Sequence, residues 1–183
     1  MKILAFAGSN SSTSINKALV TYTASFFEET EILDLNDYET VILSVDRKKE
    51  SGIPQKVLDF SEKIAGADGI LLSLAEHNGA YSAAFKNLFD WLSLIPGKTV
   101  FLEKPILLMA ASPGKRGGKS VLEIAEKRFP FNGGKVVTTF SFPNFNDNFD
   151  KEAGKITNGE LDDELIDKIQ FFQKQFRESL AEK

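Results

Sequence analysis

The chain has 183 residues, of which 42% are hydrophobic and 26% charged, and it contains no cysteine. The lack of cysteine excludes disulfides, thiolate metal sites and a cysteine nucleophile, and the single histidine, His77, excludes sites that need two imidazoles. A net charge of −4 does not indicate nucleic acid as a partner, and no stretch is apolar enough to cross a membrane. The N-terminal apolar run is too short for a signal peptide. We therefore expect one cytoplasmic domain, residues 1–183, that binds neither nucleic acid nor a membrane.

Short apolar segments alternate with longer segments of helical periodicity. The predicted strands are residues 2–7, 32–33, 69–74, 105–111 and 135–140. The predicted helices are residues 14–27, 54–65, 82–94, 118–128 and 161–180, with an irregular connection over 36–53. A helix after each strand is typical of an α/β domain with a parallel sheet. The strands at 69–74 and 105–111 are almost entirely apolar, which fits a sheet covered by helices on both faces.

Ligands of open parallel sheets bind outside the carboxyl ends of the strands, so the loops there are the candidates for a site. The first loop, residues 8–16, consists mostly of hydroxyl and carboxamide side chains and opens the first helix. Such a helix N-terminus can bind a phosphate, although an ordinary Ser/Thr helix cap is the alternative. Gly8 is the only glycine here, so the dinucleotide fingerprint G-x-G-x-x-G is absent and a single phosphate fits better.

The second loop, residues 75–82, contains the pair Asn78-Gly79, which predicts a tight turn with positive φ angles. The exposed backbone of such a turn can contact the edge of a flat heterocycle, although an ordinary polar loop is the alternative. His77 has no identifiable nucleophile to activate, so we expect it to contact a ring rather than act as a base.

The third loop, residues 112–120, nearly spells a Walker A motif. The motif requires glycine where this chain has Pro113, and counting from Gly114 leaves the loop one residue short. The amides of a shortened loop do not converge on phosphates, which disfavours a P-loop. What this sequence predicts is a glycine-rich loop whose backbone can approach a flat ligand closely.

Together the loops match three motifs in order. The first, G-S-x-R-x-x-S-x-N, is matched by Gly8, Ser9, Ser14 and Asn16. The second, P-E-Y-N followed by a helix L-K-N-x-x-D-W, is matched by Glu76, Asn78, Lys86, Asn87, Asp90 and Trp91. The third, S-x-G-x-x-G-G, is matched by Ser112, Gly114, Gly117 and Gly118. Over roughly residues 1–145 the chain therefore resembles the NADPH-dependent FMN reductase family, which includes flavodoxin-like quinone, azo and chromate reductases. It differs in having Ser11 for the family's arginine, and Ala75 and His77 for its proline and tyrosine.

The resemblance implies a flavodoxin-like three-layer α/β sandwich with a five-stranded parallel sheet of order 2-1-3-4-5. It also implies FMN as cofactor, with a hydride passing from NADPH or NADH through the flavin to a flavin, quinone, azo compound or metal oxyanion. The implied cofactor contacts are Ser9, Ser11, Ser14, Ile15, Asn16, Glu76, His77, Asn78, Gly79, Ser112, Gly114 and Gly117. The helix from Lys86 to Trp91 is expected to be structural, with Lys86 and Asp90 paired.

No catalytic side chain and no metal are implied. A homodimer or homotetramer is expected, and some of the 16 phenylalanines are candidates for its interface, with core packing as the alternative. Two other functions stay open at this point: a non-enzymatic flavodoxin-like electron carrier, and a flavin-free binding protein of the same fold.

Overall fold

A computed structural model describes the backbone of residues 1–181 and the side chains of residues 1–178. Its centre is a parallel sheet of five strands in the order β2-β1-β3-β6-β7. The strands are β1 Lys2–Gly8, β2 Glu29–Leu33, β3 Gly69–Leu74, β6 Lys104–Ala111 and β7 Gly134–Phe142. Numbered within the sheet, this is the order 2-1-3-4-5, which confirms the predicted topology.

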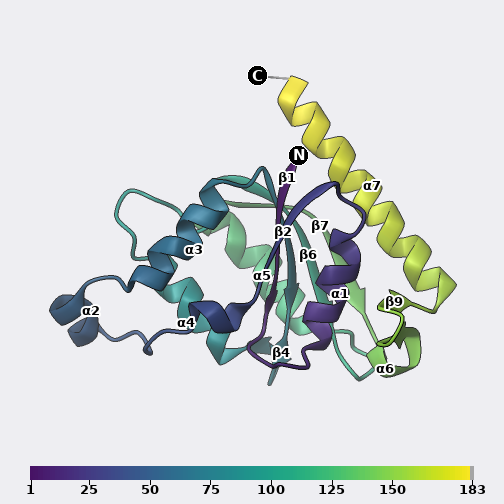
Figure 1. Cartoon of the computed structure of the whole chain (residues 1–183), viewed down its shortest axis with the longest axis horizontal. Helices are drawn as coiled ribbons and strands as arrows, with labels where there is room; N and C mark the ends of the chain where they lie inside the picture. The colour runs from purple at the N-terminus through teal and green to yellow at the C-terminus, as the bar shows by residue number, and fades with distance from the viewer. Residues whose placement is uncertain (182–183) are drawn as a thin grey trace.

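Helices cover both faces of the sheet and form the outer layers (Figure 1). On one face lie α1 Ile15–Ala24 and α7 Gly159–Ala181. On the other face lie α3 Gln55–Ala65, α4 Ala83–Leu92 and α5 Lys119–Arg128. Strand β1 divides its side chains between the two cores, with Leu4 and Phe6 toward α3 and α4, and Ile3 and Ala5 toward α1. Because both faces are covered, every residue of β3 is buried, as its apolar sequence predicts.

The clustered aromatic residues are core residues. Phe85, Phe89 and Trp91 on α4 are no more than 4% exposed, and Phe142 and Phe145 are completely buried. These side chains therefore pack in the core, which was the alternative to a subunit interface. The apolar side chains that the fold leaves exposed are different ones. They include Val41, Ile42, Val45 and Phe131, which are 57% to 84% exposed.

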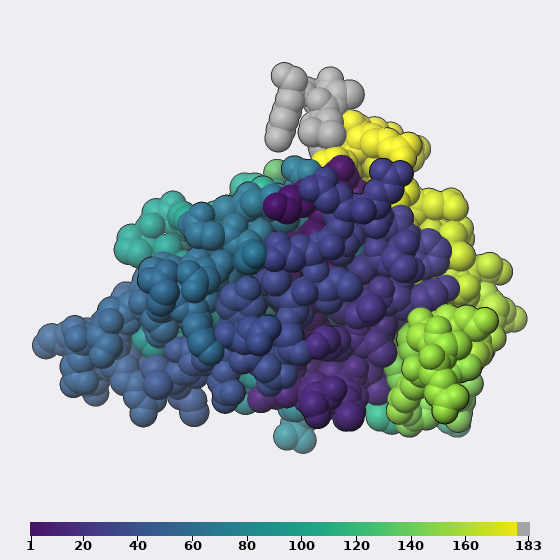
Figure 2. Space-filling model, in the orientation of Figure 1, coloured from purple at the N-terminus to yellow at the C-terminus, as the bar shows by residue number. Residues whose placement is uncertain are grey.

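The connection over residues 36–53, predicted to be irregular, contains a 3₁₀ turn, η1 Leu35–Tyr38, and a short helix, α2 Val45–Ser51. Helix α2 buries none of its residues, so it has no apolar stripe by which sequence periodicity could reveal it. Its ends are nevertheless marked by a side-chain cap at Ser44 and by Gly52 with φ 72°. Figures 1 and 2 show α2 projecting from the body of the molecule at the left.

Several short elements were also not predicted. Strands β4 Glu76–His77 and β5 Ala80–Tyr81 form a hairpin inside the second loop. After α5 comes a 3₁₀ turn, η2 Phe129–Asn132. Between β7 and α7 the chain forms α6 Phe145–Asn148 and the hairpin of β8 Phe149–Asp150 with β9 Lys155–Ile156. Elements of two to four residues are too short to show the periodicity of a helix or of a strand. None of the helices in the described chain has the length and apolar character needed to cross a membrane.

Candidate functional site

The three predicted loops meet at one end of the sheet, because β1, β3 and β6 are parallel neighbours. Ser82, the N-cap of α4, joins the first loop to the second. Its hydroxyl donates a hydrogen bond to the Gly8 carbonyl oxygen at 2.7 Å and accepts one from the Phe85 amide at 3.2 Å. The motifs do not include Ser82, and only its position before a helix could have indicated a capping role.

Asn16 joins the first loop to the two strands beside it. Its side-chain oxygen accepts hydrogen bonds from the Ser73 hydroxyl and the Ala111 amide, both at 2.8 Å. Its side-chain nitrogen donates to the Ala111 carbonyl at 3.3 Å, and the residue is only 3% exposed. The Asn16 side chain therefore holds the ends of β3 and β6 against α1. Because the side chain is engaged in this way, the group of Asn16 that can bind a phosphate is its backbone amide, which lies in the first turn of α1.

The hydroxyls of the first loop serve partly as caps. The Ser9 hydroxyl accepts from the Ser11 amide at 3.2 Å, and the Ser11 hydroxyl accepts from the Thr13 amide at 3.3 Å. The Ser14 hydroxyl caps α1 by accepting from the Lys17 amide at 3.1 Å. In each of these bonds the hydroxyl is the acceptor, so its own proton is left to donate elsewhere. The same serines can therefore cap backbone amides and also donate hydrogen bonds to a phosphate.

Cations reach this loop from two directions. The Lys17 ammonium pairs with the Asp34 carboxylate after β2, and this bond holds the pKa of Asp34 below its ordinary value. Lys17 is therefore already paired with a carboxylate and compensates poorly for the arginine that Ser11 replaces. Lys17 and Lys151 both line a groove of about 500 Å³ along α1, together with loop residues such as Ser14. Lys151 comes from the hairpin after β7, so no local motif could have placed it here.

The second loop folds as predicted at its tip, where Asn78 has φ 52° and Gly79 has φ 79°. Glu76 has a positioning role, because its carboxylate accepts a hydrogen bond from the Val121 amide in the first turn of α5 at 3.1 Å. This bond fixes the second loop against the third and places a negative charge at a helix N-terminus, where it is stabilising. The side chain of His77 is exposed and forms no hydrogen bond within the described chain, while its backbone pairs with Ala80 in the hairpin.

The glycines of the third loop divide into two kinds. Gly117 and Gly118 have φ 57° and 74°. A Cβ on Gly117 would lie 2.3 Å from the Ser141 hydroxyl oxygen, and one on Gly118 would lie 2.6 Å from the Ala110 Cβ. The backbone conformation and the lack of space therefore require glycine at both positions. Gly114 is exposed and has no atom within 4 Å of a Cβ built on it, so its surface is free for a ligand.

Tyr81 is the last residue of the β4–β5 hairpin and packs its ring against Phe85, Phe89 and Phe129. Its hydroxyl is buried and has no hydrogen-bond partner within the described chain. Burial raises the pKa of this phenol to about 12. Tyr81 is therefore neutral at physiological pH and cannot serve as a base.

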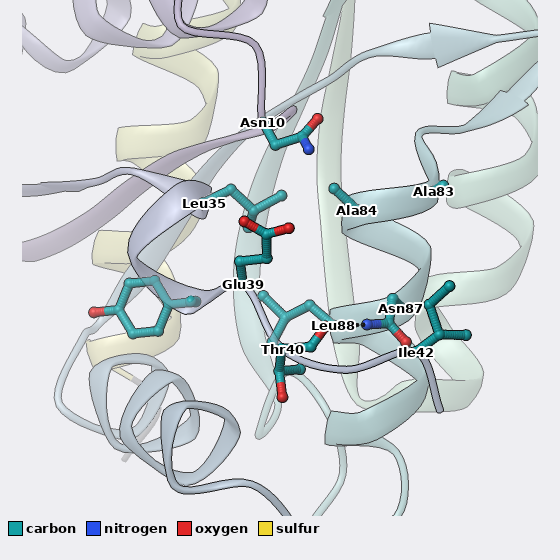
Figure 3. Close-up of a pocket in the computed structure, with 10 residues that line it drawn as sticks. Asn10, Leu35, Glu39, Thr40, Ile42, Ala83, Ala84, Asn87 and Leu88 are labelled. Carbon is teal, nitrogen blue, oxygen red and sulfur yellow. Dashed lines mark hydrogen bonds between the residues drawn. The ribbon is translucent and has the colours of Figure 1, made fainter. Parts of the chain in front are cut away.

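The helix motif on α4 shapes the surface beside the first loop. Asn87 accepts a hydrogen bond from the Leu43 amide at 2.9 Å and donates to the carbonyls of Thr40 and Val41 at 3.3 and 3.1 Å. The Trp91 indole donates to the same Val41 carbonyl at 2.9 Å. These bonds hold residues 40–43 as the wall of a cavity of about 180 Å³ (Figure 3). The structural role predicted for this helix is confirmed, and so is its Lys86–Asp90 ion pair at 2.7 Å.

The sequence matches the NADPH-dependent FMN reductase family over residues 1–147. The chain belongs to this family. It is 29% identical over 117 residues to the NADH:(hydroxy)cinnamate reductase subunit CrdA of Vibrio ruber, covering 64% of this chain and 56% of that protein. It is 31% identical over 117 residues to the 2-hydroxy-1,4-benzoquinone reductase of a Burkholderia species, covering 64% and 63% of the two chains. The match thus spans less than two thirds of the length of either relative.

Solved structures share the fold over most of the chain. FerB, a flavoenzyme NAD(P)H:(acceptor) oxidoreductase of Paracoccus denitrificans, superposes with a TM-score of 0.72 at 20% identity, covering 94% of this chain and 97% of FerB. The azoreductase AzrA superposes with a TM-score of 0.60 at 15% identity, covering 95% of this chain and 100% of AzrA. At such identities the likeness concerns the fold alone, and it includes the segment after residue 147 that lies outside the family match.

Proposed function

We propose that the protein is an FMN-dependent oxidoreductase that takes a hydride from NADPH or NADH and passes it to a small acceptor. The observation that carries the proposal is the convergence of the three family loops at one end of the sheet, tied together through Ser82, Asn16 and Glu76. The names of relatives add support, since they include a flavin reductase, a benzoquinone reductase and azoreductases. A flavin, quinone, azo compound or metal oxyanion would be the acceptor.

The chemistry of the donor set at the first loop fits a phosphate monoester. The amides of Ile15 and Asn16 begin α1, where a helix has no internal acceptor for them. The hydroxyl protons of Ser9, Ser11 and Ser14 add donors around the same turn. All of these donors are neutral, so the phosphate bonds are weaker than in relatives that have arginine in this loop.

The second and third loops fit the flavin ring. The turn at Asn78-Gly79 presents backbone groups to the ring edge, with Glu76 and His77 beside it. Gly114 offers an open backbone surface, flanked by Ser112 and Gly117. Bound FMN would supply the redox chemistry by accepting and releasing a hydride. The residues of the three loops would bind and orient the cofactor for the nicotinamide and then for the acceptor; we assign no side chain as acid or base.

We further propose that residues 1–183 form one FMN-binding domain and that it acts in the cytoplasm as a homodimer or homotetramer. A second subunit would cover the open side of the flavin. Val41, Ile42 and Val45 are exposed apolar residues available for a contact between subunits, whereas Phe131 precedes β7 at the opposite end of the sheet. The even charge balance disfavours nucleic acid and membranes as partners. Light scattering at micromolar concentration tests the assembly, and a mass of one chain would contradict it.

Titration of FMN and riboflavin into the flavin-free protein tests the cofactor site. We expect the flavin fluorescence to be quenched by both, with tighter binding of FMN because the first loop holds its phosphate. Equal dissociation constants would show that this loop holds no phosphate. Absence of quenching with either flavin would contradict the proposed function.

A further inference from the structure

The cavity beside the first loop is enclosed by three segments that are distant in sequence. Asn10 comes from the first loop, Leu35 to Ile42 from the segment after β2, and Ala83 to Leu88 from the start of α4. Its volume of about 180 Å³ is smaller than the roughly 300–1,000 Å³ of a complete small-molecule site, so it suits one part of a larger ligand. Figure 3 shows these segments around a common space.

The shape of the cavity is fixed by the protein itself. The Asn87 and Trp91 bonds to residues 40–43 hold one wall in place, and Leu35 and Leu88 are buried at its base. A wall held by four hydrogen bonds from one helix needs no ligand to form. The cavity is therefore a preorganised feature of the surface beside the first loop.

Two polar side chains of the cavity, those of Glu39 and Asn10, are exposed and form no hydrogen bond within the described chain. In Figure 3 the Glu39 carboxylate lies in the space between Leu35 and Ala84, with the Asn10 carboxamide facing the same space. Neither side chain forms a hydrogen bond or ion pair within the described chain, and none of the lining residues is a lysine, arginine or histidine. An uncompensated carboxylate repels phosphates and accepts hydrogen bonds from hydroxyl groups.

A carboxylate without a partner, beside apolar side chains, suits the binding of the ribose of a nucleotide. In other α/β folds an acidic residue after the second strand accepts hydrogen bonds from the ribose 2′-hydroxyl of NAD, whereas NADP requires a cation there. Glu39 also lies beyond β2, although after the turn η1 and not directly at the strand end, where Asp34 pairs with Lys17; apolar side chains of the cavity supply a surface for a base. The cavity adjoins the first loop through Asn10 and the end of the second loop through Ala83, so a dinucleotide lying here can extend toward the flavin.

We propose that this cavity binds the adenosine end of NADH and that Glu39 makes the protein prefer NADH to NADPH. This inference rests on the proposed function, because it concerns the hydride donor of the same site. Glu39 accepts hydrogen bonds from the ribose hydroxyls, and Asn10 supports the nucleotide at the rim. The 2′-phosphate of NADPH would lie against Glu39, and no cation lines the cavity; the nearest one shown by a contact is Arg47, which is not a lining residue and donates to the Ile42 carbonyl at 2.6 Å.

Calorimetric titration with ADP-ribose and 2′-phospho-ADP-ribose tests the proposal without any redox reaction. We expect the protein loaded with FMN to bind ADP-ribose about tenfold more tightly than the 2′-phosphorylated form. Glu39→Gln removes the charge with little change of shape and should abolish most of this preference. Asp37→Asn is the matched control, since it removes an exposed carboxylate from η1 that does not line the cavity. Asp37→Asn should leave the preference unchanged.

A kinetic measurement gives a second readout. Glu39→Gln should lower KM for NADPH about tenfold and raise KM for NADH, because it removes both the repulsion of the 2′-phosphate and the carboxylate that accepts from the ribose hydroxyls, whereas Asp37→Asn should change neither constant. Equal affinities of the parent for the two nucleotides, no measurable binding of ADP-ribose, or equal effects of Glu39→Gln and Asp37→Asn would each overturn the inference. Failure of the proposed function would be recognised separately, as a lack of FMN binding.

Discussion

Replacement of Asn16 by alanine separates a structural role of the family motif from a role in binding ligand. The change removes three hydrogen bonds, from Ser73 and from the two backbone groups of Ala111, at a site that is 3% exposed. Each bond contributes about 0.5–1.5 kcal/mol net, and buried groups left without partners cost about 1–3 kcal/mol each. Because water can reach some of these groups once the side chain is gone, we expect the lower range to apply, with a total loss of about 3 kcal/mol in the free energy of unfolding.

Urea denaturation of the flavin-free protein, followed by circular dichroism, measures this loss. Asn10→Ala is the control in the same loop; its side chain is exposed and forms no hydrogen bond within the described chain, so its stability should stay within about 0.5 kcal/mol of the parent. If Asn16→Ala were as stable as the parent and only its FMN affinity fell, the Asn16 side chain would belong to the ligand site. That result would refute the structural role inferred from its three bonds.

Five further substitutions test other parts of the site. Gly114→Ala should leave stability unchanged and weaken FMN binding, whereas Gly117→Ala, with its Cβ 2.3 Å from a neighbouring hydroxyl oxygen, should lower the free energy of unfolding by about 1–3 kcal/mol in urea titrations; equal stability of the two variants would contradict this. Ser11→Arg should tighten FMN about tenfold and leave riboflavin unchanged in fluorescence titrations, because only FMN carries the phosphate. Tyr81→Phe should stabilise the protein by about 1 kcal/mol, since it removes a buried hydroxyl that has no partner, and a loss of stability would reveal a partner for it. The pKa of Asp34 is depressed below 3.8, so its stabilising effect is present above that pH and is lost as the pH falls through the lowered pKa. Asp34→Asn should therefore be less stable than the parent at pH 7, by less than about 1 kcal/mol, and the difference should vanish in acid; a difference independent of pH would contradict the ion pair.

The sheet could be predicted because β1, β3 and β6 are nearly continuous apolar runs that alternate with amphipathic helices, whereas β2, with the sequence ETEIL, was predicted only at its two apolar residues, 32 and 33. The turn at Asn78-Gly79 could be predicted because positive φ angles favour those two residue types. Helix α2 could not, because it buries nothing and so leaves no periodic apolar pattern. The wall at residues 40–43 depends on Asn87, more than 40 positions away, and local sequence does not encode such contacts.

The motif residues could be located from the sequence, but their individual roles could not. Asn16 and Glu76 are motif positions whose side chains hold backbone groups of distant elements. A match of residue type alone does not distinguish a side chain that touches the ligand from one that fixes the loop. The partners of Asn16 lie 57 and 95 residues away in the chain, so only the fold identifies them.

Anaerobic reduction of the flavin-loaded protein is the most direct test of the function. FMN is added to the purified protein, unbound flavin is removed, and the visible absorbance is recorded before and after addition of NADH or NADPH. We expect the flavin bands to bleach and then to return when a quinone is added. Bands that neither nucleotide bleaches would contradict a reductase and indicate an electron carrier, and a protein that retains no flavin would contradict the cofactor site itself.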